Sequence, residues 1–186
     1  LEEAVAGQAQ GSYGSWLSGG LDSSIIAALA RRHTGTFHTF AGGLRDAEDL
    51  AYARDVAGHI GSEHHEVVVS LDTMIMALPE VIRALESFDA LLVRSSILNF
   101  LVAHAAADYV PQTFSGEGGD EVFAGYSYMK DIPQEDLDAE LLAAIGRLHN
   151  TALQRVDRCA AAHGLLAHVP FLHDVVIDYA LRIPVD

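Results

Sequence analysis

Two reactive residue types are almost absent from this chain of 186 residues, which contains one cysteine, Cys159, and one lysine, Lys130. A lone cysteine cannot form a disulfide bond within the chain. The paired cysteines that stabilise small secreted domains are therefore missing, and we expect the protein to work in a reducing compartment, the cytoplasm.

Long apolar runs and basic residues are scarce as well. No stretch of 18 apolar residues occurs, and the N-terminal residues lack the basic and apolar regions of a secretory signal, so we expect no membrane-spanning helix. The 11 basic residues are outnumbered by 26 acidic ones, which gives a formal net charge of −15 and argues against nucleic-acid partners. Hydrophobic residues make up 50% of the chain, enough to bury one core, so a single domain is expected.

The clearest local pattern is the octapeptide Leu-Ser-Gly-Gly-Leu-Asp-Ser-Ser at residues 17–24. It follows an apolar run and precedes a helical pattern, which predicts a strand, a glycine-rich turn and a helix. Gly19 and Gly20 let the backbone approach a ligand, and the free N–H groups of the following helix attract anions. Asp22 alone would repel a phosphate, but its carboxylate suits a divalent cation that bridges phosphate oxygens. No lysine lies nearby, as a Walker loop requires, and no Gly-x-Gly-x-x-Gly dinucleotide fingerprint is present.

A second glycine-rich segment, from Phe114 to Tyr126, also follows an apolar run. Its glycines surround three acidic residues, Glu117, Asp120 and Glu121. We expect both glycine-rich segments, and the glycine pair at residues 42–43, at the carboxyl ends of strands. In a parallel sheet those ends share one edge, so the three segments are expected to converge on one crevice.

Strand and helix patterns alternate along about the first 130 residues, which predicts an α/β fold, a parallel sheet with helices on both faces. The strands that end at Leu17, Ala41, Val69 and Phe114 should be neighbours in this sheet. From Pro133 onward we expect only helices. The predicted strands cover residues 11–17, 36–41, 64–69 and 112–114, and the predicted helices cover residues 23–33, 47–59, 71–86, 94–107 and 147–162.

The two glycine-rich segments together resemble the N-type ATP pyrophosphatases and, more narrowly, the synthetase domain of the asparagine synthetase family. The first resembles the pyrophosphate loop of these proteins, and the second resembles the family segment Ser-Gly-Glu-Gly-x-Asp-Glu-x-Phe-x-Gly-Tyr. Shorter similarities at residues 39–44, 63–66, 86–89, 94–96 and 169–172 extend the resemblance from about Tyr13 to Pro184. It implies one adenine nucleotide α-hydrolase-like ATP pyrophosphatase domain over residues 1–186, with a sheet region at about 11–130 and a helical part at about 131–186.

By resemblance, such a domain binds ATP and Mg²⁺, activates a carboxylate as an acyl-adenylate, and lets ammonia or an amine displace AMP. Asp22 and Asp120 are then the Mg²⁺ ligands, and Glu117 either is the base for the incoming nitrogen or shapes the acyl site. Arg94 would pair with a second carboxylate of an acceptor such as aspartate. The residues implied in binding ATP and pyrophosphate are Leu17, Ser18, Gly19, Gly20, Asp22, Ser23, Ser24, Gly42, Ser115, Gly116 and Asp120.

Structural alternatives stay open for several of these residues. Glu117 and Glu121 are alternatively solvated loop carboxylates. Arg94 is alternatively half of a surface ion pair with Asp89.

The C-terminal third contains a loose cluster of residues that could bind a soft metal. Cys159 and His163 are one helical turn apart, and His168 and His173 follow, so that the four side chains would suit zinc. We prefer the alternative in which the thiol is a small buried hydrophobe and the histidines pack or cap helices.

Three residues depart from the family pattern Gly-x-Glu-x-Arg-x-Pro-Phe-x-Asp. Leu166, His168 and His173 stand where the family has Glu, Arg and Asp, which would remove a charged network near the acyl pocket. The family's synthetase domain also carries a lysine further along, and Lys130 does not match it. We therefore expect these 186 residues to make little or no asparagine from aspartate, ATP and ammonia.

Two functions stay open at this stage. The first is an ATP-dependent, adenylate-forming amide synthetase. The second is a degenerate or truncated relative that binds ATP or AMP without completing amide transfer. Leu1 is not a cysteine nucleophile, and we expect no glutaminase domain of the family within these 186 residues, so nitrogen would arrive as ammonia, as an amine or from a separate glutaminase. The expected partners are small molecules, and a homodimer is left open.

Overall fold

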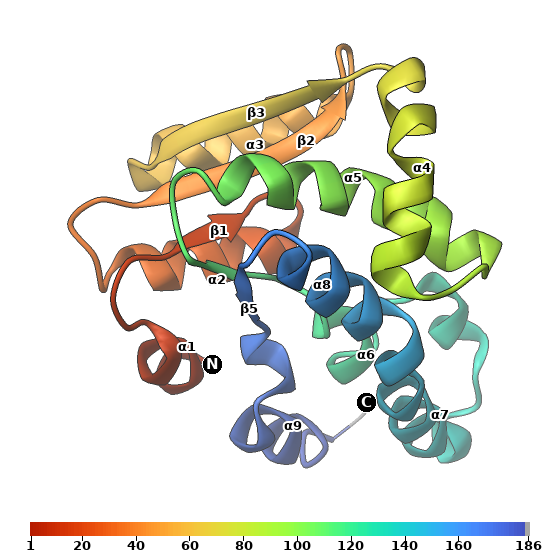
Figure 1. Cartoon of the computed structure of the whole chain (residues 1–186). Helices are drawn as coiled ribbons and strands as arrows, with labels where there is room; N and C mark the ends of the chain where they lie inside the picture. Colours follow the sequence, from red (N-terminus) through yellow and green to blue (C-terminus); the bar gives the residue numbers. More distant parts are fainter. Residues whose placement is uncertain (185–186) are drawn as a thin grey trace.

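The computed structural model describes residues 1–184 as a layered α/β fold (Figure 1); Val185 and Asp186, at the end of the predicted helical part, lie outside the described residues. The five strands form one parallel sheet in the order β3-β2-β1-β4-β5. This order confirms that the four strands expected from the sequence are neighbours, with β1 beside β4. The strands are β1 (Gly14–Trp16), β2 (His38–Leu44), β3 (Glu63–Val69), β4 (Gln112–Phe114) and β5 (Leu166–His168).

Helices cover both faces of the sheet, as predicted (Figure 1). The helices α1, α2 and α3 pack on one face, α5 packs on the other, and α4 and α8 pack against α5. Their bounds are α1 (Glu2–Gln8), α2 (Leu21–Arg31), α3 (Glu48–Ile60), α4 (Leu71–Leu85), α5 (Ala90–Ala106), α6 (Gly119–Val122), α7 (Gln134–Arg147), α8 (Ala152–Ala161) and α9 (Asp174–Ala180). Within residues 1–184 no single helix is long and apolar enough to cross a membrane; α4 and α5 reach that length only as a pair bent by 108°.

Two hydrophobic cores follow from the alternation of side chains along the strands. Phe40 and Ala41 are consecutive in β2, and they lie in different cores. Ala41 joins Phe114 and the inner residues of α2 and α3, whereas Phe40 joins Val102 and other residues of α5. The sheet is therefore fixed between two packed layers, and the carboxyl ends of its central strands are held in place.

The C-terminal part contains a strand that the sequence did not predict. We expected only helices after Pro133, but β5 pairs in parallel with β4. Gly164 follows α8 and has a φ of +75°, a left-handed conformation that residues other than glycine rarely adopt. The backbone N–H of Leu166 then donates to the carbonyl of Pro111, and β5 is held by such backbone bonds. A strand of three residues is too short to show the period-two pattern that identifies strands in a sequence. β1 and β4 are equally short, but each is followed by a glycine-rich segment that marks its end, and β5 is not.

Asp89 caps α5 instead of pairing with Arg94. Its carboxylate accepts a hydrogen bond from the N–H of Leu92 at 2.8 Å, while Arg94 is exposed and forms no ion pair with any residue that the structure describes. The ion-pair alternative for Arg94 is therefore wrong.

We expect Asp89→Ala to lower the free energy of unfolding by about 1 kcal/mol, because an N-terminal N–H of α5 loses its acceptor. Asp89→Asn should keep most of that stability, since an amide oxygen also caps a helix. Arg94→Ala should change it by less than about 0.5 kcal/mol. Urea unfolding of the three variants measures this, and equal losses for Asp89→Ala and Arg94→Ala would contradict it.

Candidate functional site

The loop after β1 turns tightly against α3. Gly19 has a φ of +82°, and a Cβ atom there would lie 2.5 Å from the Cβ atom of Tyr52, so only glycine fits. The loop is closed by its own hydrogen bonds. The hydroxyl of Ser24 donates to the carbonyl of Gly20 at 2.7 Å, and the N–H of Gly20 donates to the hydroxyl oxygen of Ser18 at 3.3 Å. The loop is therefore a preformed turn.

Helix α2 begins directly after this turn, and its first turn is left without a side-chain cap. The N-cap residue is Gly20, which has no side chain to accept a hydrogen bond. The hydroxyl oxygens of Ser18 and Ser23 lie 2.9 Å apart beside this end of the helix. Uncapped N–H groups, the positive end of the helix dipole and two hydroxyl groups together favour an anion such as a phosphate.

The loop between β4 and α6 packs directly on the start of α2. A Cβ atom on Gly116 would lie 2.6 Å from the backbone nitrogen of Ser23, and one on Gly119 would lie 2.6 Å from Cγ of Asp22. The glycines of the second segment are therefore required for contact with the first. The two segments meet because β1 and β4 are neighbours and end at the same edge of the sheet.

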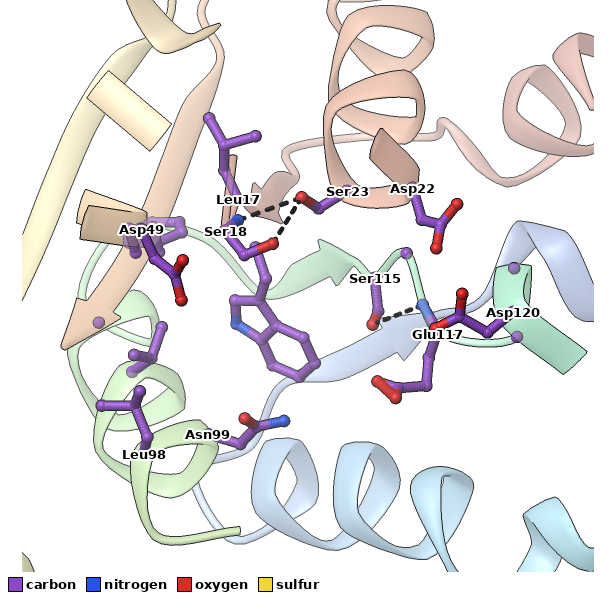
Figure 2. Close-up of a pocket in the computed structure, with 18 of the residues that line it drawn as sticks. Leu17, Ser18, Asp22, Ser23, Asp49, Leu98, Asn99, Ser115, Glu117 and Asp120 are labelled. Carbon is purple, nitrogen blue, oxygen red and sulfur yellow. Dashed lines mark hydrogen bonds between the residues drawn. The ribbon is translucent and has the colours of Figure 1, made fainter. Parts of the chain in front are cut away.

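A cavity of about 310 Å³ opens where the two loops meet (Figure 2). This volume suits a small-molecule ligand. Of the residues that the sequence predicted, Gly19, Gly20, Ser24 and Arg94 do not line it. Gly19 and Gly20 belong to the turn before α2, Ser24 lies in the first turn of α2, and Arg94 lies on the exposed surface of α5. The predicted residues that do line it are Leu17, Ser18, Asp22, Ser23, Gly42, Ser115, Gly116, Glu117 and Asp120.

Leu17 and Gly42 were predicted and line the apolar half of the cavity, but the rest of this half was not predicted. Its wall includes Phe40 from β2 and Leu98 and Val102 from α5, and Trp16 and Asn99 also line the cavity. The indole N–H of Trp16 is buried and has no hydrogen-bond partner among the residues that the structure describes. Asn99 left a weak signal in the sequence, because it interrupts an otherwise apolar stretch of α5. Apolar walls with a few polar groups are typical of a site for a flat organic ring.

The opposite half of the cavity is strongly acidic. Asp22, Asp120 and Glu121 line it together, and Figure 2 shows Asp22 approaching from α2 and Asp120 from α6. Burial, followed by repulsion from Asp120 and Glu121, raises the pKa of the Asp22 carboxyl above its usual value. Such uncompensated carboxylates fit a divalent cation, and Mg²⁺ commonly uses only one or two protein carboxylates together with phosphate oxygens. The donor set at Asp22 and Asp120 therefore fits Mg²⁺.

Glu117 and Glu121 are not solvated, so that alternative is wrong. Glu121 is 6% exposed, and its carboxylate accepts a hydrogen bond from the hydroxyl of Tyr126. Glu117 forms an ion pair with Arg155 of α8, a residue that the sequence did not suggest. Burial raises the pKa of Glu117, and the nearby Arg155 opposes this increase.

The three residues that depart from the family pattern lie outside the cavity wall. Leu166 is 56% exposed on β5. Nε2 of His168 lies 2.8 Å from Oε1 of Gln112, and burial lowers the pKa of this histidine. Nδ1 of His173 accepts a hydrogen bond from the N–H of Val175 at the start of α9. These side chains thus have structural contacts of their own.

The cysteine and histidines of the zinc alternative have separate partners. The Cys159 thiol is buried against the carbonyl of Ser96, and burial raises its pKa to about 12. His163 packs against the rings of Phe100 and His104. Among residues 1–184 no three His, Cys, Asp or Glu side chains are grouped as metal ligands. A magnesium ion at Asp22 and Asp120 would therefore take its other ligands from phosphate and water.

The chain is similar in sequence to known proteins over most of its length. A family model described as asparagine synthase matches residues 1–135 and 132–186. A probable glutamine-hydrolysing asparagine synthetase of Dictyostelium discoideum is 36% identical, over 98% of this chain and 36% of that protein. The glutamine-hydrolysing asparagine synthetase of Bos taurus is 40% identical over 93% of this chain and 32% of its own length, so the chain spans about a third of these relatives. Among solved structures, an NMN synthetase from Francisella tularensis is similar, with a TM-score of 0.46 and 17% identity over 91% of this chain and 93% of that chain.

Proposed function

The chain belongs to the asparagine synthase family, and on that premise we propose that it is the ATP-binding, adenylate-forming part of an ATP-dependent amide ligase. In this reaction an acceptor carboxylate attacks the α-phosphorus of ATP and releases pyrophosphate. Ammonia or an amine then attacks the acyl-adenylate and releases AMP. The observation that carries the proposal is that two glycine-rich loops meet at a single cavity. The first loop leads into the positive end of the α2 dipole, and the second segment carries acidic side chains.

The nucleotide would lie across both halves of this cavity. The N–H groups at the start of α2 and the hydroxyls of Ser18 and Ser23 would bind the β- and γ-phosphates. Leu17, Gly42 and the apolar wall of α5 would hold the adenosine. This arrangement leaves the α-phosphorus near Ser115, between the anion site and the remaining acidic residues.

The acidic residues would provide for the metal and for the second half of the reaction. Asp22 and Asp120 would hold Mg²⁺, which when bound neutralises the charge that develops on the departing pyrophosphate. Glu117 would face the acyl group, and its carboxylate is suited to accept a proton from the incoming nitrogen. The curated relatives are named as glutamine-hydrolysing, and we propose that this chain likewise receives ammonia from a glutaminase.

Trp16 is the only tryptophan of the chain, and it lines the cavity. We therefore expect Mg²⁺-ATP to change the intrinsic tryptophan fluorescence in a saturable manner, because the ligand alters the surroundings of that one indole. ATP with excess chelator should give a much weaker response, because without Mg²⁺ the five carboxylates that line the cavity repel the phosphates. Trp16→Phe should abolish the signal while calorimetry still detects binding. Absence of binding by both methods at millimolar ATP would refute the proposed function.

Isotope exchange between pyrophosphate and ATP in the presence of candidate acceptors separates the two functions left open by the sequence. Exchange that depends on an acceptor, followed by amide formation when ammonia is added, supports a ligase. Exchange without amide formation supports a protein that adenylates but does not transfer. Leu166 is exposed, and His168 and His173 have structural contacts of their own. The cavity wall itself therefore gives no reason to expect that amide formation is defective.

A further inference from the structure

Arg155 and Glu117 form an ion pair at the border of the cavity. Arg155 belongs to α8, 38 residues further along the chain than Glu117, and one Nη2 hydrogen bond joins it to Oε1 of the carboxylate. Both side chains are largely buried, with 21% and 25% of their surfaces exposed. Glu117 lines the cavity, and its carboxylate points into it (Figure 2), whereas Arg155 is not one of the residues that line the cavity.

The pairing uses only part of each side chain. Nε of Arg155 is buried without a partner among the described residues, so the guanidinium does not form the two parallel bonds that its geometry allows. Oε2 of Glu117 forms no hydrogen bond within the part of the chain that the structure describes. One carboxylate oxygen is thus fixed by Arg155, and the other is left free beside the cavity.

The charges around Glu117 make this pairing necessary. Glu121 and Asp120, both from α6, face it and disfavour its ionised form, as does burial. Arg155 is the one basic residue that opposes these effects within the described part of the chain. A buried carboxylate that loses its partner is expected to take up a proton, because the charged form becomes too costly.

Given the proposed function, on which this inference rests, we propose that Arg155 is a positioning residue that holds Glu117 at the cavity wall as a charged carboxylate with one oxygen free to accept a proton. In the amide-forming step the nitrogen bonds to the acyl carbon, the bond from that carbon to the AMP oxygen breaks, and one N–H proton passes to Glu117. Arg155 acts only through Glu117 and does not touch the substrate.

Three substitutions test this role. Arg155→Met removes the charge and keeps much of the side-chain volume, and Arg155→Lys keeps the charge. Arg158→Met is the matched control, because Arg158 lies one turn along α8 and pairs with the exposed Glu86. At saturating Mg²⁺-ATP and acceptor, the rate of amide formation should fall about tenfold at neutral pH for Arg155→Met, much less for Arg155→Lys, and not at all for Arg158→Met.

The pH profile distinguishes positioning from a structural effect. The ionised form of Glu117 is the active one, so a raised pKa moves the acid limb of the Arg155→Met profile to higher pH, and the lost rate returns as the pH increases. A uniform loss at every pH, or the same loss in Arg158→Met, would overturn the proposal.

A readout that needs no turnover separates this inference from the proposed function. The carboxyl ¹³C resonance of Glu117, assigned by its absence in Glu117→Gln, should titrate at higher pH in Arg155→Met than in the parent protein. An unchanged titration would overturn the role of Arg155. If the parent protein forms no amide with any acceptor, the proposed function fails, while this titration still decides whether Arg155 keeps Glu117 charged.

Discussion

Asp22→Asn should lower the rate of ATP–pyrophosphate exchange by about 10²–10³-fold and remove most of the Mg²⁺ dependence of ATP binding. The asparagine side chain has nearly the same shape, so the backbone of the phosphate loop is retained. What is lost is a charged oxygen ligand, and hard cations such as Mg²⁺ bind amide oxygens less strongly than carboxylates. Exchange kinetics and calorimetry at several Mg²⁺ concentrations measure both effects.

Asp72→Asn is the matched control for this substitution. Asp72 lies in the first turn of α4, as Asp22 does in the first turn of α2, so both variants remove one negative charge from the same kind of helix position. The loss of a favourable interaction with the helix dipole costs about 0.3–1 kcal/mol and should not affect Mg²⁺. Equal losses of exchange activity in both variants would show that Asp22 acts through the helix dipole and not through a metal.

Stability should change in the direction opposite to activity. Burial and the neighbouring Asp120 and Glu121 raise the pKa of Asp22, which means that its ionised form is disfavoured in the folded protein. Without Mg²⁺ at neutral pH, Asp22→Asn should therefore unfold at the same temperature as the parent protein or at a higher one. The parent should gain stability from Mg²⁺-ATP, and the variant should gain much less. A variant that is less stable without Mg²⁺ would contradict this account.

The sequence was sufficient to predict the two loops and their meeting. Each loop can be recognised from its local sequence, because glycines, hydroxyls and carboxylates directly follow an apolar strand. The convergence of the loops then required only the rule that parallel strands end at one edge. The structure confirms that β1 and β4 are neighbours, and it places Asp22 and Gly119 in contact.

The other half of the cavity depends on packing between distant segments, which no local pattern encodes. The need for glycine at residue 42 is clear only once α5 is in place, since a Cβ atom there would lie 2.4 Å from Cγ2 of Val102. The ion pair of Glu117 with Arg155 joins two distant segments, and no sequence pattern links one to the other. Arg94 is an example of a wrong prediction. Its side chain has the right chemistry to bind a carboxylate, but it lies on the exposed surface of α5 and does not line the cavity.

A second substitution should have a comparable effect by moving the two loops apart. In Gly116→Ala the new Cβ atom would lie 2.6 Å from the backbone nitrogen of Ser23 and 2.8 Å from the carbonyl carbon of Asp22. Both contacts are with backbone atoms, which cannot move aside as a flexible side chain can. The β4–α6 loop must therefore shift away from α2, and a displacement of about 1 Å at a reacting centre can cost about a hundredfold in rate. We expect exchange activity to fall by at least about that factor.

Gly146→Ala provides the matched control, because Gly146 lies inside α7 and, among the described residues beyond its own turns of helix, no atom lies within 4 Å of the added methyl group. Alanine favours a helix over glycine by about 1 kcal/mol, so this variant should be slightly more stable and fully active. Exchange assays and urea unfolding of both variants provide the comparison. Normal activity in Gly116→Ala would mean that the two loops need not touch for ATP to react. The close approach of Gly116 to α2 would then serve the packing of the loops alone, and the position of the α-phosphorus would have to be set by other contacts in the cavity.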